Sequence, residues 1–317
     1  MDGMQYRRNT AVTRNNNVTS VIVVLLLAIA LLNFLAFALD GVANADIGKI
    51  STAQDNLAQA QSDNQSLQSQ RDSLSVEWRN AQGRLSFKGD GSGKVCYLTF
   101  DDGPCDENTP KNLEILKEKG AVATWFCLAN TDEYQYLNLS LCKDIEAQGS
   151  AIGIHDWDQN SSYNYYKGTV DNYFKTDFNK AEKVLEDTVG HEIYICRFAG
   201  GSSTIGYYNS KIGKTLPQAV LKKGYQYFDW NVLAGDSDPK MMENGKVPAD
   251  KMVSYVLDQA EHFAETDSPI CILMHDNPGK ETTTEALPEI IDGLKDLGYE
   301  FKTLDYDSPG FYQGDIL

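Results

Sequence analysis

Acidic, basic and imidazole side chains recur at or just past the ends of short apolar segments of this chain. Asp101 and Asp102 follow the segment that begins at Val95, and a Gly-Pro turn comes next. The same pattern holds at four later places: His155, Arg197, Asp236 and the pair His275-Asp276. Each alone has a structural explanation, because an acidic pair before a turn often caps a helix and a lone His is more often structural than a ligand. Together they resemble a metal-assisted hydrolase that has an acid and a base.

The segments that would position these side chains alternate between strand-like and helix-like patterns. The strand-like segments are Val95 to Phe100, Ala121 to Leu128, Ala151 to Ile154, Ile193 to Cys196, Tyr225 to Trp230, Ile270 to Met274 and Phe301 to Leu304. The helix-like segments are Thr109 to Lys119, Val170 to Val189, Asp250 to Ala264 and Thr284 to Leu297. This alternation predicts parallel strands with right-handed crossovers, in a barrel or a doubly wound sheet. In either case the chemistry belongs at the carboxyl ends of the strands, where the polar residues fall.

Five short motifs between Val95 and Leu304 carry a family resemblance. They are Thr99-Phe-Asp-Asp-Gly-Pro104, Ile152-Gly-Ile-His155, Arg197-Phe-Ala-Gly-Gly-Ser202, Phe228-Asp-Trp-Asn-Val232 with Gly235-Asp236, and Ile272-Leu-Met-His275-Asp276. Their content and order resemble the polysaccharide deacetylases, which share the NodB-homology domain of carbohydrate esterase family 4. The resemblance implies an α/β fold, a distorted barrel of about seven parallel strands. It also implies removal of acetyl groups from N-acetylated sugars of peptidoglycan or chitin-like polysaccharide.

The resemblance further implies a role for each matched residue. Asp101 would be the base that deprotonates the attacking water, with Arg197 orienting it. His275, its pKa raised by Asp236, would protonate the leaving amine. Three positions would contact the substrate: the backbone amide of Gly200 at the oxyanion, and Trp230 and Leu273 in an acetyl pocket.

The implied metal site departs from the family pattern at one ligand. Asp102 and His155 would bind a divalent metal, zinc in most members, but Gln159 occupies the place of a second metal-binding His. An amide oxygen is a poor zinc ligand compared with imidazole, and the neighbouring Asp158 could substitute for it. Two hypotheses follow. The chain is a deacetylase with a weakened metal site, or a catalytically inactive relative that binds wall glycan or scaffolds an envelope complex.

The N-terminal region predicts a membrane anchor. Residues 1–20 carry three Arg and precede an apolar run from Val21 to Leu39, and acidic residues follow that run. Nineteen residues nearly cross a hydrocarbon core of about 30 Å, whereas the apolar part of a cleaved signal peptide spans only about 7 to 15 residues. The Arg residues place the tail in the cytoplasm. We therefore expect a single-pass protein of the cell membrane with its C-terminal domain outside the cell, and a cleaved signal peptide remains the alternative.

Residues 40–85 separate this run from the C-terminal domain. From Ile50 to Leu85 apolar residues recur at heptad positions, which predicts a helical stalk that either pairs as a coiled coil and makes a homo-oligomer, or stays single and solvated. A Gly-rich linker over residues 86–94 leads into the domain of residues 95–317.

The charge distribution limits the partners of that domain. The formal net charge is −17, and residues 1–85 are balanced, so the excess of acid falls on residues 86–317. Nucleic acid is excluded as a partner, because its binding depends on clustered Lys and Arg.

Overall fold

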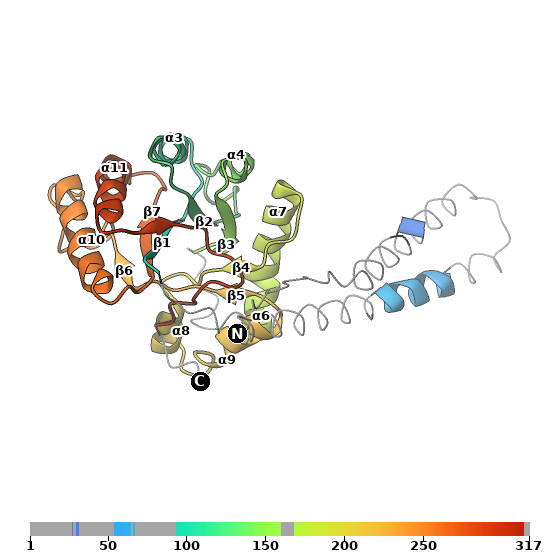
Figure 1. Cartoon of the computed structure of the whole chain (residues 1–317). Coiled ribbons are helices and arrows are strands. Elements are labelled where there is room, and N and C mark those ends of the chain that lie inside the picture. The colour runs from blue at the N-terminus through green and yellow to red at the C-terminus, as the bar shows by residue number, and fades with distance from the viewer. Residues whose placement is uncertain are drawn as a thin grey trace, which may run out of the picture. The chain divides into compact units, whose positions relative to one another are not determined.

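The computed structural model describes residues 93–159 and 168–313, and in the N-terminal region residues 27, 30–31, 54–64 and 66 (Figure 1). The chain divides into two compact units, Met1–Leu74 and Ser75–Leu317, of which the second holds the five sequence motifs. The predicted tail, anchor, stalk and linker lie largely outside the described residues. Among the residues that are described, no helix combines the length and apolar character needed to cross a membrane.

In the described part of the chain, eight strands form one sheet in which every neighbouring pair is parallel. They are β1 (Val95–Asp101), β2 (Ala123–Cys127), β3 (Ala151–Ile154), β4 (Ile195–Cys196), β5 (Gln226–Tyr227), β6 (Val232–Leu233), β7 (Ile270–His275) and β8 (Glu300–Phe301). The order is β5-β4-β3-β2-β1-β7-β6, and β8 pairs with the start of β1. The curled sheet confirms the predicted distorted barrel of parallel strands. The sequence pattern did not reveal β6, which is only two residues long.

Helices surround this sheet on its outer side (Figure 1). They are α3 (Thr109–Lys119), α4 (Leu141–Ala147), α6 (Val170–Tyr173), the π-helical segment η1 (Phe174–Phe178), α7 (Asn179–Val189), α8 (Ser202–Tyr208), α9 (Thr215–Lys222), α10 (Ala249–Ala264) and α11 (Glu281–Asp296). The bounds predicted for α3 are confirmed, because a Pro stands in its first turn and Gly120 ends it with a left-handed φ of 58°. The helix predicted from Val170 to Val189 is interrupted by η1.

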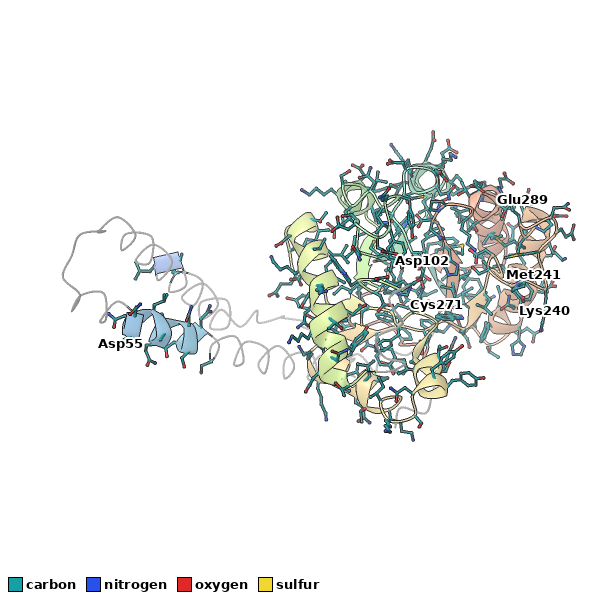
Figure 2. All side chains as sticks on the ribbon, turned by 180° about the vertical axis from the view of Figure 1, so that it is seen from behind. Asp55, Asp102, Lys240, Met241, Cys271 and Glu289 are labelled. Atoms are coloured by element: carbon teal, nitrogen blue, oxygen red, sulfur yellow. The ribbon has the colours of Figure 1, made fainter. Side chains whose placement is uncertain are left out.

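The core lies between the sheet and these helices. All five residues of β2 are buried, and so are Cys96 to Asp101 of β1, as expected for parallel strands covered on both faces. Phe100 stacks on Trp125 with ring centroids 4.8 Å apart. Figure 2 shows side chains filling this space. The six cysteines, including Cys271, are buried free thiols.

The strand register brings distant polar residues together. In the β1–β7 ladder Asp101 pairs with His275, and in the β1–β2 ladder it pairs with Phe126. The fold therefore places two of the predicted site residues side by side at the carboxyl ends of adjacent strands, where parallel α/β sheets carry their sites.

Candidate active site

The turn after β1 holds the two adjacent carboxylates in different directions. Asp102 has a φ of 70°, and the Gly103–Pro104 peptide bond that follows is cis. Position 103 requires Gly, because a Cβ there would lie 2.0 Å from the Asp276 Oδ1 atom. Asp276, fully buried, is held against this turn by hydrogen bonds that its carboxylate accepts from Thr109 Oγ1 and Trp125 Nε1 at 2.6 and 2.7 Å.

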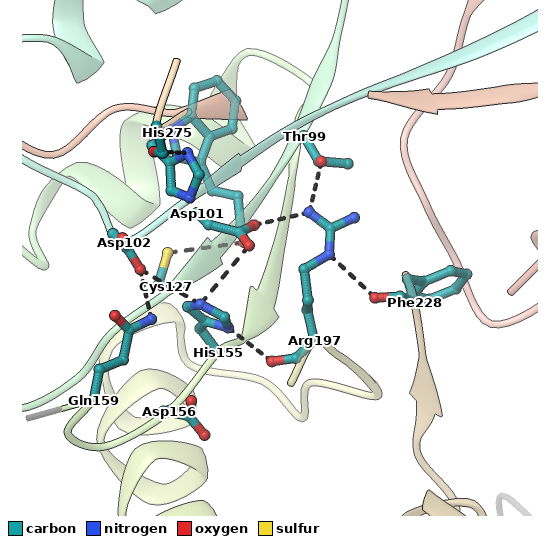
Figure 3. A network of polar contacts seen from close by, with 12 residues as sticks. Thr99, Asp101, Asp102, Cys127, His155, Asp156, Gln159, Arg197, Phe228 and His275 are labelled. Atoms are coloured by element: carbon teal, nitrogen blue, oxygen red, sulfur yellow. Dashed lines mark hydrogen bonds and ion pairs between the residues drawn. The ribbon is translucent and has the colours of Figure 1, made fainter. Parts of the chain in front are cut away.

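Asp101 is fixed by a buried arginine. Arg197, only 1% exposed, donates from Nη1 to Asp101 Oδ1 at 2.8 Å and to Thr99 Oγ1 at 2.6 Å (Figure 3). Its other nitrogens donate to the backbone carbonyls of Phe228 and Asp229 at 3.1 and 3.2 Å. Since guanidinium is permanently charged, Asp101 has a buried counter-ion, and Oδ2 is the oxygen that the arginine leaves uncovered.

His155 is oriented to offer one ring nitrogen to the site. Its Nδ1 lies 2.7 Å from the backbone carbonyl of Arg197, which can only accept, so Nδ1 carries a proton. Nε2 lies 3.4 Å from Asp102 Oδ1 and 3.7 Å from Asp101 Oδ2. Burial disfavours the imidazolium, but the carboxylates of Asp101 and Asp102 outweigh burial and raise the pKa of His155 to about 10. Two negative groups therefore converge on Nε2.

Gln159, the third residue of the predicted metal site, also lies next to Asp102. Gln159 donates from Nε2 to Asp102 Oδ1 at 2.7 Å, so its amide adjoins the Asp102–His155 pair (Figure 3). Asp158 is instead buried and accepts from the Tyr134 hydroxyl at 3.2 Å. Within the described part of the chain, no group of three His, Cys, Asp or Glu side chains could hold a metal ion.

The donor set nevertheless fits a divalent cation. A metal-binding imidazole usually donates its other ring N–H to a carbonyl or carboxylate, and the Arg197 carbonyl takes that place at Nδ1 of His155, so that Nε2 faces the site. Asp102 supplies a carboxylate oxygen, and rotation of the Gln159 amide would turn its oxygen toward the same point. The site therefore offers one imidazole, one carboxylate and one neutral amide.

The second acid–base pair lies at the end of β7. His275 Nδ1 lies 2.9 Å from Asp236 Oδ1, and the His275 backbone N–H donates to Asp236 Oδ2 at 2.8 Å. Burial opposes protonation of the ring, but the Asp236 carboxylate, helped by Asp102 and Asp101, raises the pKa of His275 to about 9. His275 is thus held as an imidazolium at neutral pH, which a proton donor requires.

The sequence motifs did not identify three residues that support Asp236. Thr283 donates from Oγ1 to Asp236 Oδ2 at 3.1 Å, while Lys280 donates to the Asp236 carbonyl at 2.8 Å and to Ser237 Oγ at 2.7 Å. Ser237 Oγ in turn lies 3.3 Å from His275 Nδ1. The only sequence signal was a Thr-x-x-Ala-Leu-Pro run that begins at Thr283.

The predicted substrate-contacting residues are placed less completely. Gly200 is exposed, and among the described residues its N–H has no hydrogen-bond partner. Trp230 is half-buried, and the Arg197 guanidinium lies 5.5 Å from its ring centroid. Leu273 lies within β7, paired with Thr99, and is 8% exposed. A free amide fits the predicted oxyanion role, whereas an acetyl pocket at Trp230 and Leu273 stays a prediction.

Comparison with known proteins gives a consistent result. Residues 88–228, a segment that includes Asp101, Asp102, His155 and Arg197, match the model of the polysaccharide deacetylase family. The Bacillus subtilis protein YheN, a relative named for the same family, is 31% identical over 226 residues, which cover 70% of this chain and 71% of that protein. A peptidoglycan-N-acetylglucosamine deacetylase of Bacillus cereus is 29% identical over 216 residues, covering 68% and 71%.

Solved structures agree in fold. The catalytic domain of peptidoglycan N-acetylglucosamine deacetylase from Eubacterium rectale is similar with a TM-score of 0.59 and 26% identity, covering 70% of this chain and 93% of that one. A carbohydrate esterase of family 4 from Streptococcus mutans gives a TM-score of 0.57 at 25% identity, covering 70% and 91%. With the motifs in order, the acid and base pairs assembled and the sheet shared, the chain belongs to the polysaccharide deacetylase family.

Proposed function

We propose that this protein removes N-acetyl groups from peptidoglycan or a chitin-like polysaccharide by metal-assisted general acid–base catalysis. One observation carries the proposal. A proton acceptor, the carboxylate of Asp101, and a proton donor, the imidazolium of His275, occupy paired positions of adjacent strands. Each is held by a buried partner of opposite charge, Arg197 for the first and Asp236 for the second. Amide hydrolysis needs this combination of a base for water and an acid for the leaving amine.

Asp102 and His155 would hold the divalent cation, zinc in most of the family, with Gln159 as a weak third ligand. The cation would polarise the acetamide carbonyl and make the attacking water more acidic. Burial opposes ionisation of Asp102, but the His155 hydrogen bond and the charges of His275 and His155 outweigh burial and lower the pKa of Asp102 to about 2. Its carboxylate is therefore charged at every pH at which the enzyme would work.

The chain's own groups account for the proton transfers. Asp101 Oδ2, which the arginine leaves uncovered, takes a proton from water as the water oxygen bonds to the acetyl carbon. The negative charge that develops on the acetyl oxygen faces the Gly200 N–H. His275 then gives its proton to the nitrogen as the carbon–nitrogen bond breaks. Acetic acid and a free amino sugar leave, the acid loses its proton to solvent, and the proton on Asp101 returns to His275 through solvent.

The same proposal includes the placement of the protein. We infer that the run from Val21 to Leu39 anchors the chain in the cell membrane with the C-terminal domain outside the cell, close to wall glycan. Protease added to intact cells should then remove the region after Asp40. A secreted mature protein that begins near Asp46 would contradict the anchor.

The test of the activity is acetate release by the wild-type protein. Purified protein with excess zinc or cobalt is incubated with N-acetylglucosamine tetramer and with peptidoglycan, and acetate and new amines are quantified together. The His275→Ala variant should lose activity by a factor of about 10² to 10⁴, because the proton donor is gone. The comparisons give no support to a non-catalytic relative. Background acetate from the wild type with both substrates and both metals would revive that alternative.

A further inference from the structure

A second buried carboxylate adjoins the site without touching the reacting atoms. Asp229 is 0% exposed, and its two oxygens accept three hydrogen bonds. Oδ1 accepts from the Ser202 backbone N–H at 2.8 Å, while Oδ2 accepts from the Ser202 hydroxyl and, at 2.8 Å, from the Gln313 backbone N–H. Three donors therefore converge on a group that, when ionised, can only accept.

The backbone of Asp229 joins two further segments. Its carbonyl accepts from Arg197 Nη2 at 3.2 Å, and its N–H donates to the carbonyl of Gly310 at 3.0 Å. Residues 310–313 form the C-terminal strap. Gln313 of this strap also donates from its side chain to the carbonyl of Trp230 at 3.1 Å. One residue thus connects the arginine that holds the base, the segment that begins at Ser202, and the strap.

The loop before Ser202 packs against this junction. Gly200 and Gly201 have φ values of 71° and 80°, so both lie in the left-handed region that side chains rarely adopt. A Cβ on Gly201 would lie 3.0 Å from Trp230, 3.1 Å from Gln313 Oε1 and 3.3 Å from Asp229 Oδ1. The Gly201 N–H donates to the Phe198 carbonyl at 2.9 Å, whereas the N–H of the exposed Gly200 has no hydrogen-bond partner among the described residues.

We infer that Asp229 is a positioning residue that fixes the Gly200 amide toward the acetyl oxygen, and that the C-terminal strap completes its support. The inference rests on the proposed deacetylase function. Within the loop, the Gly201 N–H is bonded to the Phe198 carbonyl and the Gly200 carbonyl accepts from Thr204 Oγ1. The two bonds from Ser202 to Asp229 connect this loop to the segment that holds Trp230 and to the strap. Loss of those bonds would misplace a donor whose value depends on geometry in the transition state.

The test is the Asp229→Asn variant of the full chain. Asn keeps the size of the side chain but turns an NH₂ group toward one of the three donors. With N-acetylglucosamine tetramer we expect kcat to fall about 10- to 100-fold while KM is unchanged, because the amide acts mainly in the transition state. Affinity for a methylphosphonamidate analogue, whose tetrahedral centre carries the oxyanion, should fall by the same factor. Zinc affinity, measured with the metal alone, should equal that of the wild type.

Asp305→Asn is the matched control, because Asp305 also accepts from a backbone N–H and a Ser hydroxyl, at 3.0 and 2.8 Å, but on an exposed turn. It should keep wild-type kcat. Ser202→Ala, which removes only the hydroxyl donor, should give a smaller fall in kcat than Asp229→Asn and serves if the latter does not fold.

Three results would overturn the inference: wild-type kcat in Asp229→Asn, a loss of zinc affinity in parallel with kcat, or equal analogue affinity in variant and wild type. Failure of the proposed function would show differently, as no acetate release by the wild type. The phosphonamidate comparison would still decide the role of Asp229 in that case.

Discussion

The candidate site has two parts: a proposed proton-transfer part, Asp101 and His275 with their partners, and a proposed metal-binding part, Asp102, His155 and Gln159. The carboxylates of the two parts differ in burial and in hydrogen-bond partners. The side chain of Asp236 is 3% exposed, and each of its oxygens has at least one donor. The side chain of Asp101 is 5% exposed and has an arginine counter-ion. Asp102, by contrast, has a side chain that is 17% exposed, and its neighbours are one imidazole and one amide.

This contrast distinguishes two properties of the site: how firmly its side chains are held, and how many residues are available to bind a metal. The base and the acid are fixed by charged hydrogen bonds in low-dielectric surroundings, where such bonds are strongest. The proposed metal-binding part offers, among the described residues, two side chains of the kinds that zinc prefers, Asp102 and His155. We therefore expect metal occupancy, rather than proton transfer, to set the activity of this protein when metal is scarce.

The largest expected effect lies in the proton-transfer part. Asp101→Asn should reduce turnover by about 10² to 10⁴, because the amide cannot accept a proton from water. Zinc affinity should change little, since Asp101 is assigned as base and not as ligand. Turnover and zinc titration are measured on the same preparation. If the variant keeps wild-type turnover, Asp101 is not the base. If it loses zinc affinity and turnover together, Asp101 belongs to the metal-binding part.

The second effect concerns the pH range of the acid. His275 must be protonated to act, so activity should fall as the pH rises through its pKa of about 9. Removing the Asp236 charge by Asp236→Asn withdraws the main group that raises this pKa. The alkaline limb of the pH–kcat profile should then move to lower pH, toward the ordinary imidazole value near 6.5. An unmoved limb would mean that His275 is not the group that titrates.

The third effect addresses the metal part directly. Gln159→His restores an imidazole beside Asp102, so zinc should bind at least about tenfold more tightly, equivalent to about 1.4 kcal/mol. Calorimetric zinc titration measures it, and acetate release at limiting zinc should rise in parallel. If the wild type already binds zinc tightly and the variant matches it, another group such as Asp158 completes the site. Tighter zinc without more acetate would locate a further defect outside the metal part.

The smallest effect should come from removing one hydrogen bond to Asp236, the partner of His275. Thr283→Val keeps the shape of the side chain but removes one donor to Asp236 Oδ2, which keeps its bond from the His275 backbone. We expect the free energy of unfolding to fall by about 1 to 2 kcal/mol, with kcat reduced only a few-fold. Denaturant unfolding and initial rates provide the comparison. A loss of kcat as large as that of Asp101→Asn would show that Thr283 does more than support Asp236.

Sequence patterns predicted those parts of the fold that depend on local signals. The segment Ala151 to Ile154 is confirmed as β3, and the predicted ends of α3 agree because Pro and Gly mark them. Short elements were missed: α4, α8 and α9 span seven or eight residues, too few to show a clear helical period. Nothing local in the predicted helix from Val170 to Val189 indicated the π-helical turn of η1.

In the candidate site, too, some residues could be predicted from the sequence and others could not. Its charged members could be predicted because parallel strands bring their carboxyl ends to one edge, and all of them lie there. The residues that support these side chains could not be predicted. Thr99 contacts Arg197, Lys280 contacts Asp236, and Asp229 contacts Ser202 only because of tertiary packing. Gln159 was recognised by comparison with the family motif, whereas its bond to Asp102 came from the structure.

The pairing of Asp101 with His275 in the β1–β7 ladder limits the sequence changes that this fold can absorb. An insertion or deletion of one residue inside either strand would let the backbone ladder re-form one step along. Side chains alternate between the two faces of a strand, so that step would turn the base or the acid away from its partner. The strands would still pair, but Asp101 and His275 would no longer face the same site, and activity would be lost. Active descendants of this sequence can therefore change length in loops and helices, but in β1 and β7 they can change only by substitution.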